Sequence, residues 1–123
     1  MDKISIIVSY RNEEENLGTF VYNLEKEFKN KKITQYEIIF IDDHSSDSSL
    51  KFLLPLSRKN KKIKIIKMRK RFGHSHSIQA ALENIDSKNF CTFIDCDLQD
   101  PPDLIAKYLN FKDKKNTIHF IRK

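Results

Sequence analysis

The chain has 123 residues, which is enough for one domain around a single core and hardly enough for two. Charged residues make up 33% of it, hydrophobic residues make up 39%, and only two glycines and three prolines are present, which excludes a disordered, collagen-like or low-complexity protein. No apolar run approaches the roughly 18 residues that cross a bilayer, and charge follows too early for a secretory signal, so we expect a soluble intracellular protein.

The net charge of +6 suits nucleic acid, anionic lipid or a phosphorylated small molecule equally well. Most residues from Arg58 to Arg71 are basic, but no aromatic residue lies among them to stack on bases, so we expect no nucleic-acid partner. Solvated charge on a helix end and a strand edge is the simplest interpretation, and contact with an anionic membrane surface is a second one. Cys91 and Cys96 form no CxxC pair, which favours reduced core thiols over a disulfide or zinc site.

The start of the chain has the pattern of a strand followed by a helix. Residues 4–8 form a short β-branched apolar run, which predicts a strand buried on both faces. Asn12 is placed to cap the next helix, and Glu15 stands three residues later in the capping-box position. Apolar residues then repeat at helical spacing: Leu17, Phe20, Val21, Leu24 and Phe28.

A second strand and a second helix follow. Residues 37–41 predict another buried strand, which ends at Asp42 and Asp43. Three serines offer caps for a helix that would run through Leu50, Leu53 and Leu54: Ser45, Ser46 and Ser48. Because an interior proline removes a hydrogen bond and clashes with the preceding turn, we expect Pro55 to bend or break this helix near Leu54.

The remaining sequence continues the alternation. Residues 63–68 predict a third strand, residues 90–94 a fourth and residues 117–121 a fifth, with Asp100 at the start of the intervening fourth helix. The third helix follows Gly73 and has one apolar face: Ile78, Ala81, Leu82 and Ile85. Strands that alternate with helices over short links predict an α/β fold, with a mostly parallel sheet and helices on both faces.

Polar clusters follow three of the predicted strands. In open parallel sheets, ligands bind outside the carboxyl ends of the strands. The clusters after the first, second and fourth strands are Ser9, Tyr10, Arg11, Asn12 and Glu13; Asp42, Asp43, His44 and Ser45; and Asp95, Cys96, Asp97, Leu98, Gln99 and Asp100. Helix capping explains some of these residues, but it explains less well why two acidic clusters follow two different strands.

The last of these clusters has the pattern of a cation site. Asp95, Asp97 and Gln99 are spaced by two, so in an extended segment their side chains project to the same side. Three oxygen ligands suit a hard cation such as Mg²⁺ or Mn²⁺, whose remaining positions stay open to water and substrate. An Asp-x-Asp alone is weak, because phosphatases with a nucleophilic Asp share it; those enzymes, however, carry the pair on the opening strand.

The string DLQDPPD at residues 97–103 resembles the signature of family 2 inverting glycosyltransferases, most closely the polyprenyl-phosphate sugar transferases related to dolichyl-phosphate mannose synthase. Three further strings stand in the order of that family: VSYRNEEENL at 8–17, IDDHSSDSS at 41–49 and RKRFGHSHSIQAAL at 69–82. The resemblance implies a GT-A, Rossmann-like nucleotide-sugar transferase. Residues 1–123 would form a single nucleotide-sugar-binding domain, truncated relative to the full glycosyltransferase domain.

The resemblance also implies roles for the polar loops. Ser9, Arg11 and Glu13 would border the nucleobase of a UDP- or GDP-sugar, and Asp42 would hold the base or ribose. The acceptor would be a polyprenyl phosphate, at the cytoplasmic, inner face of a membrane. By the same resemblance, the acceptor-binding segments would lie beyond Lys123.

The resemblance implies that other residues contact the diphosphate of the donor. Asp97 would be the catalytic residue, and Asp95, Asp97 and Gln99 would hold Mg²⁺ or Mn²⁺, with Asp95 also on the ribose-phosphate side. Arg71 and residues 72–77 would lie near the donor. His74 and His76 in that segment are either phosphate contacts or ordinary surface histidines.

Two further expectations concern the whole chain. A non-catalytic nucleotide-binding remnant that lacks the acceptor half is the alternative to a transferase. A sheet without its covering partners would also expose apolar surface and an unpaired edge, which favours self-association.

Overall fold

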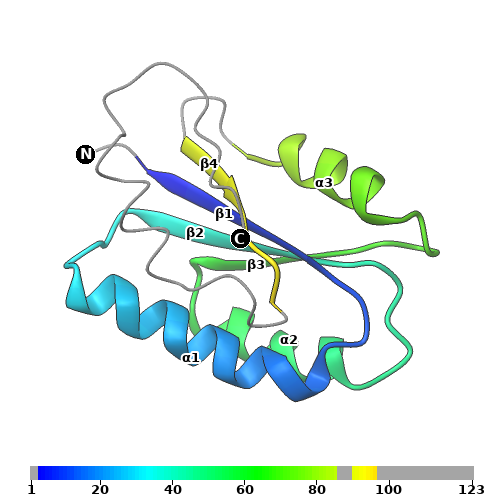
Figure 1. Cartoon of the computed structure of the whole chain (residues 1–123), viewed down its shortest axis with the longest axis horizontal. Coiled ribbons are helices and arrows are strands. Elements are labelled where there is room, and N and C mark those ends of the chain that lie inside the picture. Colours follow the sequence, from blue (N-terminus) through cyan, green and yellow to red (C-terminus); the bar gives the residue numbers. More distant parts are fainter. Residues whose placement is uncertain (1–2, 86–89, 97–123) are drawn as a thin grey trace, which may run out of the picture.

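The computed structural model describes residues 3–85 and 90–96, which form a layered α/β structure (Figure 1). The described part contains a four-stranded parallel sheet with the strand order β3-β2-β1-β4. Its elements in chain order are β1 (Ile4–Tyr10), α1 (Glu14–Asn30), β2 (Tyr36–Asp42), α2 (Ser49–Lys59), β3 (Ile63–Lys67), α3 (His74–Leu82) and β4 (Phe90–Phe93). The predicted parallel sheet with helices on both faces is therefore confirmed.

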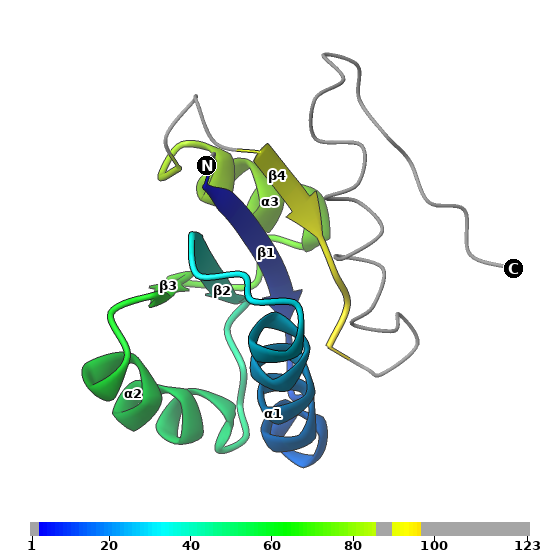
Figure 2. The same ribbon diagram turned by 90° about the vertical axis from the view of Figure 1, so that its left-hand side faces the viewer.

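Two apolar layers hold the sheet between the helices. Alternate residues of the central strands β1 and β2 point to opposite faces, so both faces need cover. On one face, Val8 and Phe40 pack with residues of α1 and α2, and Phe20 meets the Phe40 ring edge-on. On the other face, Ile7 and Ile39 pack with Ala81 of α3. Figure 2 shows this division, with α1 and α2 on one side of the sheet and α3 on the other.

The register aligns the carboxyl ends of the strands. Tyr10, the last residue of β1, stands opposite Asp42, the last residue of β2, and Asp42 stands opposite Lys67, the last residue of β3. On the other side of β1, Ile7 pairs with Phe93, and the Ile94 N–H donates to the Ile7 carbonyl at 3.0 Å. The loops that follow all four strands therefore begin at one edge of the sheet.

Helix α2 continues through Pro55, so the break near Leu54, one of the two predicted outcomes, does not occur. The helix runs to Lys59, with Leu53 fully buried before the proline and Leu56 packed against the core after it. Pro55 itself is exposed, as is Lys51, whose carbonyl has no helical N–H donor because proline lacks one. Packing on both sides of the proline thus outweighs a local penalty on the solvent face.

Asn12 does not cap α1, contrary to the prediction. The helix begins at Glu14 after Glu13, and no side-chain capping hydrogen bond forms there, so Glu15 takes no part in a capping box. Asn12 has a positive φ of 55° and directs its side chain to the loop after β2 instead. The predicted serine caps of α2 are also wrong, because Ser48 precedes the helix without a capping side-chain bond.

The buried apolar face of α3 contains fewer residues than predicted. Ala81 is buried and Ile78 is half-buried, but Leu82 is 47% exposed, and Ile85 lies beyond the helix while still packing against its core cluster. The predicted helix after Asp100 and the predicted strand at 117–121 lie outside the described residues. Within residues 3–85 and 90–96, no helix has the length and apolarity to cross a membrane.

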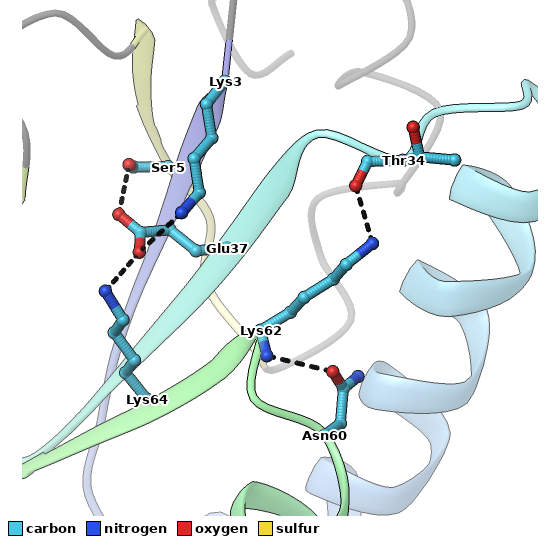
Figure 3. A network of polar contacts seen from close by, with 7 residues as sticks. All are labelled: Lys3, Ser5, Thr34, Glu37, Asn60, Lys62 and Lys64. Carbon is cyan, nitrogen blue, oxygen red and sulfur yellow. Dashed lines mark hydrogen bonds and ion pairs between the residues drawn. The ribbon is translucent and has the colours of Figure 1, made fainter.

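Lys62, from the basic stretch at 58–71, makes structural contacts at the amino ends of the strands. Lys62 donates from Nζ to the Thr34 carbonyl at 2.6 Å, and its ammonium lies 4.4 Å from the centre of the Tyr36 ring. Its backbone N–H donates to the Asn60 side chain, as Figure 3 shows. These contacts fix the turn that leads into β3.

Candidate functional site

The loops after β1 and β2 form one hydrogen-bonded unit at the carboxyl edge of the sheet. The side-chain oxygen of Asn12 accepts the backbone N–H groups of Ser46 at 2.8 Å and Asp47 at 3.3 Å. In return, the Asn12 backbone N–H donates to the Ser45 hydroxyl at 3.0 Å. Asn tolerates a positive φ better than most residues, and here that conformation directs the amide to the neighbouring loop.

The start of α1 is tied to the same neighbouring loop. The Glu14 backbone N–H donates to Asp47 at 3.2 Å, the Ser48 N–H donates to the Glu14 carboxylate at 3.1 Å, and the Glu13 N–H donates to the Ser49 hydroxyl at 3.0 Å. Burial works against the charged form of Asp47, but hydrogen bonds from Ser49 and Glu14 outweigh it and lower the pKa of this carboxyl. These bonds join residues 11–14 and 44–49 into one hydrogen-bonded unit, which we call the rim.

Asp42 lies beneath this rim and is fully buried. The Tyr10 hydroxyl donates to Asp42 Oδ2 at 3.0 Å, and the Ser45 backbone N–H donates to Oδ1 at 2.6 Å. Burial, together with the adjacent Asp42 carboxylate, raises the pKa of Tyr10 well above its usual range, so this hydroxyl keeps its proton. Both oxygens of Asp42 thus already have one donor each from the protein.

Asp43, the next residue, binds a third segment, which connects β3 to α3. It is 6% exposed, and its carboxylate accepts the backbone N–H of Phe72 at 2.9 Å and that of Gly73 at 3.1 Å. Two successive carboxylates therefore organise different loops: Asp42 the loop that follows β2, and Asp43 the segment between β3 and α3.

The predicted site residues are distributed along this edge. Ser9 is half-buried and Arg11 is exposed, both at the end of β1, and the Glu13 carboxylate accepts a bond from Asn16 at 2.9 Å. Arg71 is exposed beyond β3, and Asp95 is half-buried just beyond β4. The predicted residues Asp97 and Gln99 lie outside the described residues. The strand order therefore sets Arg71, Asp42, Ser9 with Arg11, and Asp95 in sequence along the edge.

Two organising residues were not predicted in these roles. Asn12 was expected to cap a helix, and Asp43 was noted only as one more acidic residue. The signal for Asn12 is an asparagine two residues after a buried strand, because asparagine adopts a positive φ more readily than most residues. The signal for Asp43 is weaker, because its partners lie 29 and 30 residues away in the sequence.

The donor set expected for a metal is only partly described. Asp95 supplies one carboxylate, and within residues 3–85 and 90–96 no group of three or more His, Cys, Asp or Glu side chains could hold a metal ion. The chemistry of the predicted set, two carboxylates and one amide oxygen, fits Mg²⁺ or Mn²⁺.

Comparison with known proteins supports the same family as the sequence strings. The family model described as Glycosyl transferase family 2 matches residues 5–122, nearly the whole chain. The chain belongs to this glycosyltransferase family. The prediction made from the strings at 8–17, 41–49, 69–82 and 97–103 is therefore confirmed.

Relatives with curated names include uncharacterized glycosyltransferases and an undecaprenyl-phosphate sugar transferase. An uncharacterized glycosyltransferase of Synechocystis is 38% identical over 88% of this chain and 33% of its own length. The undecaprenyl-phosphate 4-deoxy-4-formamido-L-arabinose transferase of Proteus mirabilis is 33% identical over 87% of this chain and 32% of its own length. The chain spans about a third of the length of the curated relatives it matches.

Solved structures share the fold. A mannosyltransferase from Pyrobaculum calidifontis, in complex with GDP-Man and Mn²⁺, is 16% identical with a TM-score of 0.76, over 92% of this chain and 33% of its own. TarS of S. aureus, in complex with UDP-GlcNAc, is 23% identical with a TM-score of 0.73, over 90% of this chain and 31% of its own. At these identities the likeness shows the fold, and it confirms the predicted GT-A architecture.

Proposed function

We propose that this family 2 protein binds a UDP- or GDP-sugar together with Mg²⁺ or Mn²⁺ and transfers the sugar to a polyprenyl phosphate. The observation that carries the proposal is the joined set of loops at the carboxyl edge of the sheet, which Asn12, Asp42 and Asp43 hold in place. Open parallel sheets bind ligands at this edge. Neighbours of the same fold were solved with GDP-Man and with UDP-GlcNAc.

The nucleoside would lie over the rim formed by the first two loops. Arg11 is exposed there, and its guanidinium can stack on a base or donate to its carbonyl groups. Ser9 and Glu13 flank it and would border the base, and Asp42 would accept a hydrogen bond from the base or ribose. Each oxygen of Asp42 already has one protein donor and the residue is fully buried, so a hydrogen bond to the ligand would require the loops above it to shift.

The diphosphate would lie toward β4, where Asp95, Asp97 and Gln99 would hold the cation, with Asp97 assigned to catalysis. Arg71 follows β3, on the other side of the nucleoside in the strand order, and would approach the donor from there. A bound divalent cation would offset the charge that develops on the departing nucleoside diphosphate. The exposed Arg71 guanidinium matches phosphate geometry, because it offers paired donors.

The proposed acceptor follows from the names of relatives, which include an undecaprenyl-phosphate transferase and a bactoprenol glucosyl transferase of Shigella phage SfV. In the transfer, a phosphate oxygen of the acceptor bonds to the anomeric carbon as the bond from that carbon to the diphosphate breaks. A phosphate is already ionised at neutral pH, so it needs positioning more than a general base. Because such acceptors are lipids, the proposal locates the reaction at a membrane surface, and the family resemblance favours its cytoplasmic face.

Calorimetric titration of the folded chain with UDP, GDP and their sugar conjugates tests donor binding. We expect at least one nucleotide to bind, more tightly with Mg²⁺ or Mn²⁺ than with a chelator. Asp97→Asn should remove most of this metal dependence, because it removes a charged ligand and keeps the shape. Glu83→Gln, which neutralises an exposed carboxylate at the far end of α3, is the matched control and should bind normally.

Two results would contradict the donor site. One is the absence of binding by any of these nucleotides at millimolar concentration in a folded sample with metal present. The other is unchanged metal dependence in Asp97→Asn. Transfer is measured separately, as incorporation of labelled sugar into a polyprenyl phosphate by the protein.

A further inference from the structure

We propose that Asp43 is a positioning residue of the donor site, and that it acts by holding the segment 69–73, which carries Arg71, against the end of β2. The proposal rests on the proposed function, because it assigns Arg71 to the donor. Its starting observation is the pair of backbone N–H groups, from Phe72 and Gly73, that the Asp43 carboxylate accepts at 2.9 and 3.1 Å.

Asp43 is itself held firmly, which lets it serve as an anchor. Its backbone N–H donates to the Tyr10 carbonyl at 3.0 Å, so it extends the pairing of β1 and β2 by one residue. The carbonyl of Asp42 accepts the Met68 N–H at 2.9 Å, which ties the end of β3 to the same point. Because the residue is only 6% exposed, the carboxylate has little access to water and depends on the two amides for its hydrogen bonds.

The segment needs this anchor because its own sequence does not fix it. Gly73 has a φ of 90° and a ψ of 170°, a conformation open essentially to glycine alone, and glycine has many alternatives in a free loop. The carboxylate also lies at the start of α3, where negative charge is favourable to the helix. Bonds from amides to a carboxylate are stronger than bonds between neutral groups.

The anchored Phe72 amide also holds the backbone of the basic residues that precede it. Arg69, Lys70 and Arg71 are all exposed, and Arg71 directly precedes the anchored amide of Phe72. The Phe72 ring lies 6.1 Å from the His76 ring, and Lys70 Nζ lies 5.2 Å from the centre of the Phe72 ring. The backbone of Arg71 is therefore held, while its guanidinium stays accessible to a phosphate group.

Hydrogen exchange and nucleotide titration together test this role. In Asp43→Asn, which keeps the size of the side chain, we expect the Phe72 and Gly73 amides to lose protection while amides in β1 keep theirs. We expect affinity for UDP or GDP with Mg²⁺ to fall about tenfold, because a displaced Arg71 would lose one charged hydrogen bond to a phosphate oxygen. Glu83→Gln, with the same change of charge at the other end of α3, should alter neither measurement.

A double-mutant cycle separates positioning from general destabilisation. If Asp43 acts through the segment, Arg71→Gln weakens nucleotide binding in the wild-type background and has much less effect in the Asp43→Asn background. Independent effects of the two substitutions overturn the positioning role, and so does unchanged protection of Phe72 and Gly73 in Asp43→Asn. If the folded wild-type chain binds neither nucleotide, the proposed function fails, and the exchange data still decide whether Asp43 anchors the segment.

Discussion

The ammonium group of Lys64 lies 2.6 Å from Oε2 of Glu37, a carboxylate that is buried within the sheet. Ser5 donates to the other oxygen at 2.7 Å, and Lys3 Nζ lies 3.6 Å from Oε2 (Figure 3). The three partners come from the strands on either side of β2 and from the residue before β1. The cluster therefore links β1, β2 and β3 near their amino ends, opposite the candidate site.

The Glu37 cluster predicts a pH-dependent loss of stability. Burial works against the charged form of Glu37, but Lys64, Ser5 and Lys3 outweigh it and lower the pKa of this carboxyl below its ordinary value of 4.5. Because the unfolded chain binds the proton more tightly, the contribution is complete above about pH 4.5 and is lost as the pH falls through the lower folded pKa. Urea unfolding of the wild type and Glu37→Gln across this range measures it.

We expect Glu37→Gln to be less stable than the wild type by about 1–2 kcal/mol at neutral pH, and the difference to shrink in acid. Lys64→Met should also destabilise the fold, because the buried Glu37 carboxylate would then have only the more distant ammonium group of Lys3 as its cation. Lys67→Met, which removes an exposed lysine from the same strand, is the control. A constant difference between wild type and Glu37→Gln at every pH would refute the assigned charge pairing.

Sequence patterns were sufficient for the strands because β1 and β2 are buried on both faces, which leaves a dense β-branched run in each. They were misleading at Pro55, because the rule that an interior proline interrupts a helix takes no account of the core packing of Leu53 and Leu56 on either side. The penalty for an interior proline is fixed by local geometry, but the packing that offsets it depends on residues distant in the sequence.

The α2 proline gives a direct test of this balance. Pro55→Ala restores an N–H donor for the Lys51 carbonyl and removes the ring from the helix interior, so we expect the free energy of unfolding to rise. The gain should be below the roughly 3 kcal/mol by which proline is less favourable than alanine in a helix interior, because proline also restricts the unfolded chain. Thermal unfolding measures it, and a lower melting temperature in Pro55→Ala would contradict this account.

The two glycines of the chain should respond to alanine with opposite signs. Gly18 lies inside α1, and an added Cβ would meet the Phe52 ring at 3.6 Å, an ordinary contact, so Gly18→Ala should stabilise by about 0.5–1 kcal/mol. Gly73 has open space around it but a φ of 90°, so Gly73→Ala should destabilise by about 1–3 kcal/mol. Denaturant unfolding of both variants checks the signs, and stabilisation by Gly73→Ala would show that this conformation is not needed.

The candidate site could be located from the sequence, but its construction could not. The carboxyl ends of parallel strands meet at one edge, so Arg11, Asp42 and Asp95 could be assigned to it by strand order alone. The side-chain contacts of Asn12 and Asp43 span 29 to 35 residues, and no local pattern specifies such pairs. A residue that shapes a loop and a residue that binds a ligand look alike in one sequence.

Asn12 is expected to hold the rim of the site, and three substitutions separate its two properties. Asn12→Gly keeps the positive φ but loses the acceptor for Ser46 and Asp47, so it should destabilise the fold by about 1 kcal/mol and weaken binding of UDP or GDP. Asn12→Ala loses the acceptor and also strains the backbone, so it should cost more. Asn12→Asp keeps an acceptor oxygen at the same place and should stay close to the wild type. Unfolding and nucleotide titration of the three variants give the order, and equal losses in Asn12→Asp and Asn12→Gly would show that the bonds to the second loop do not hold the rim.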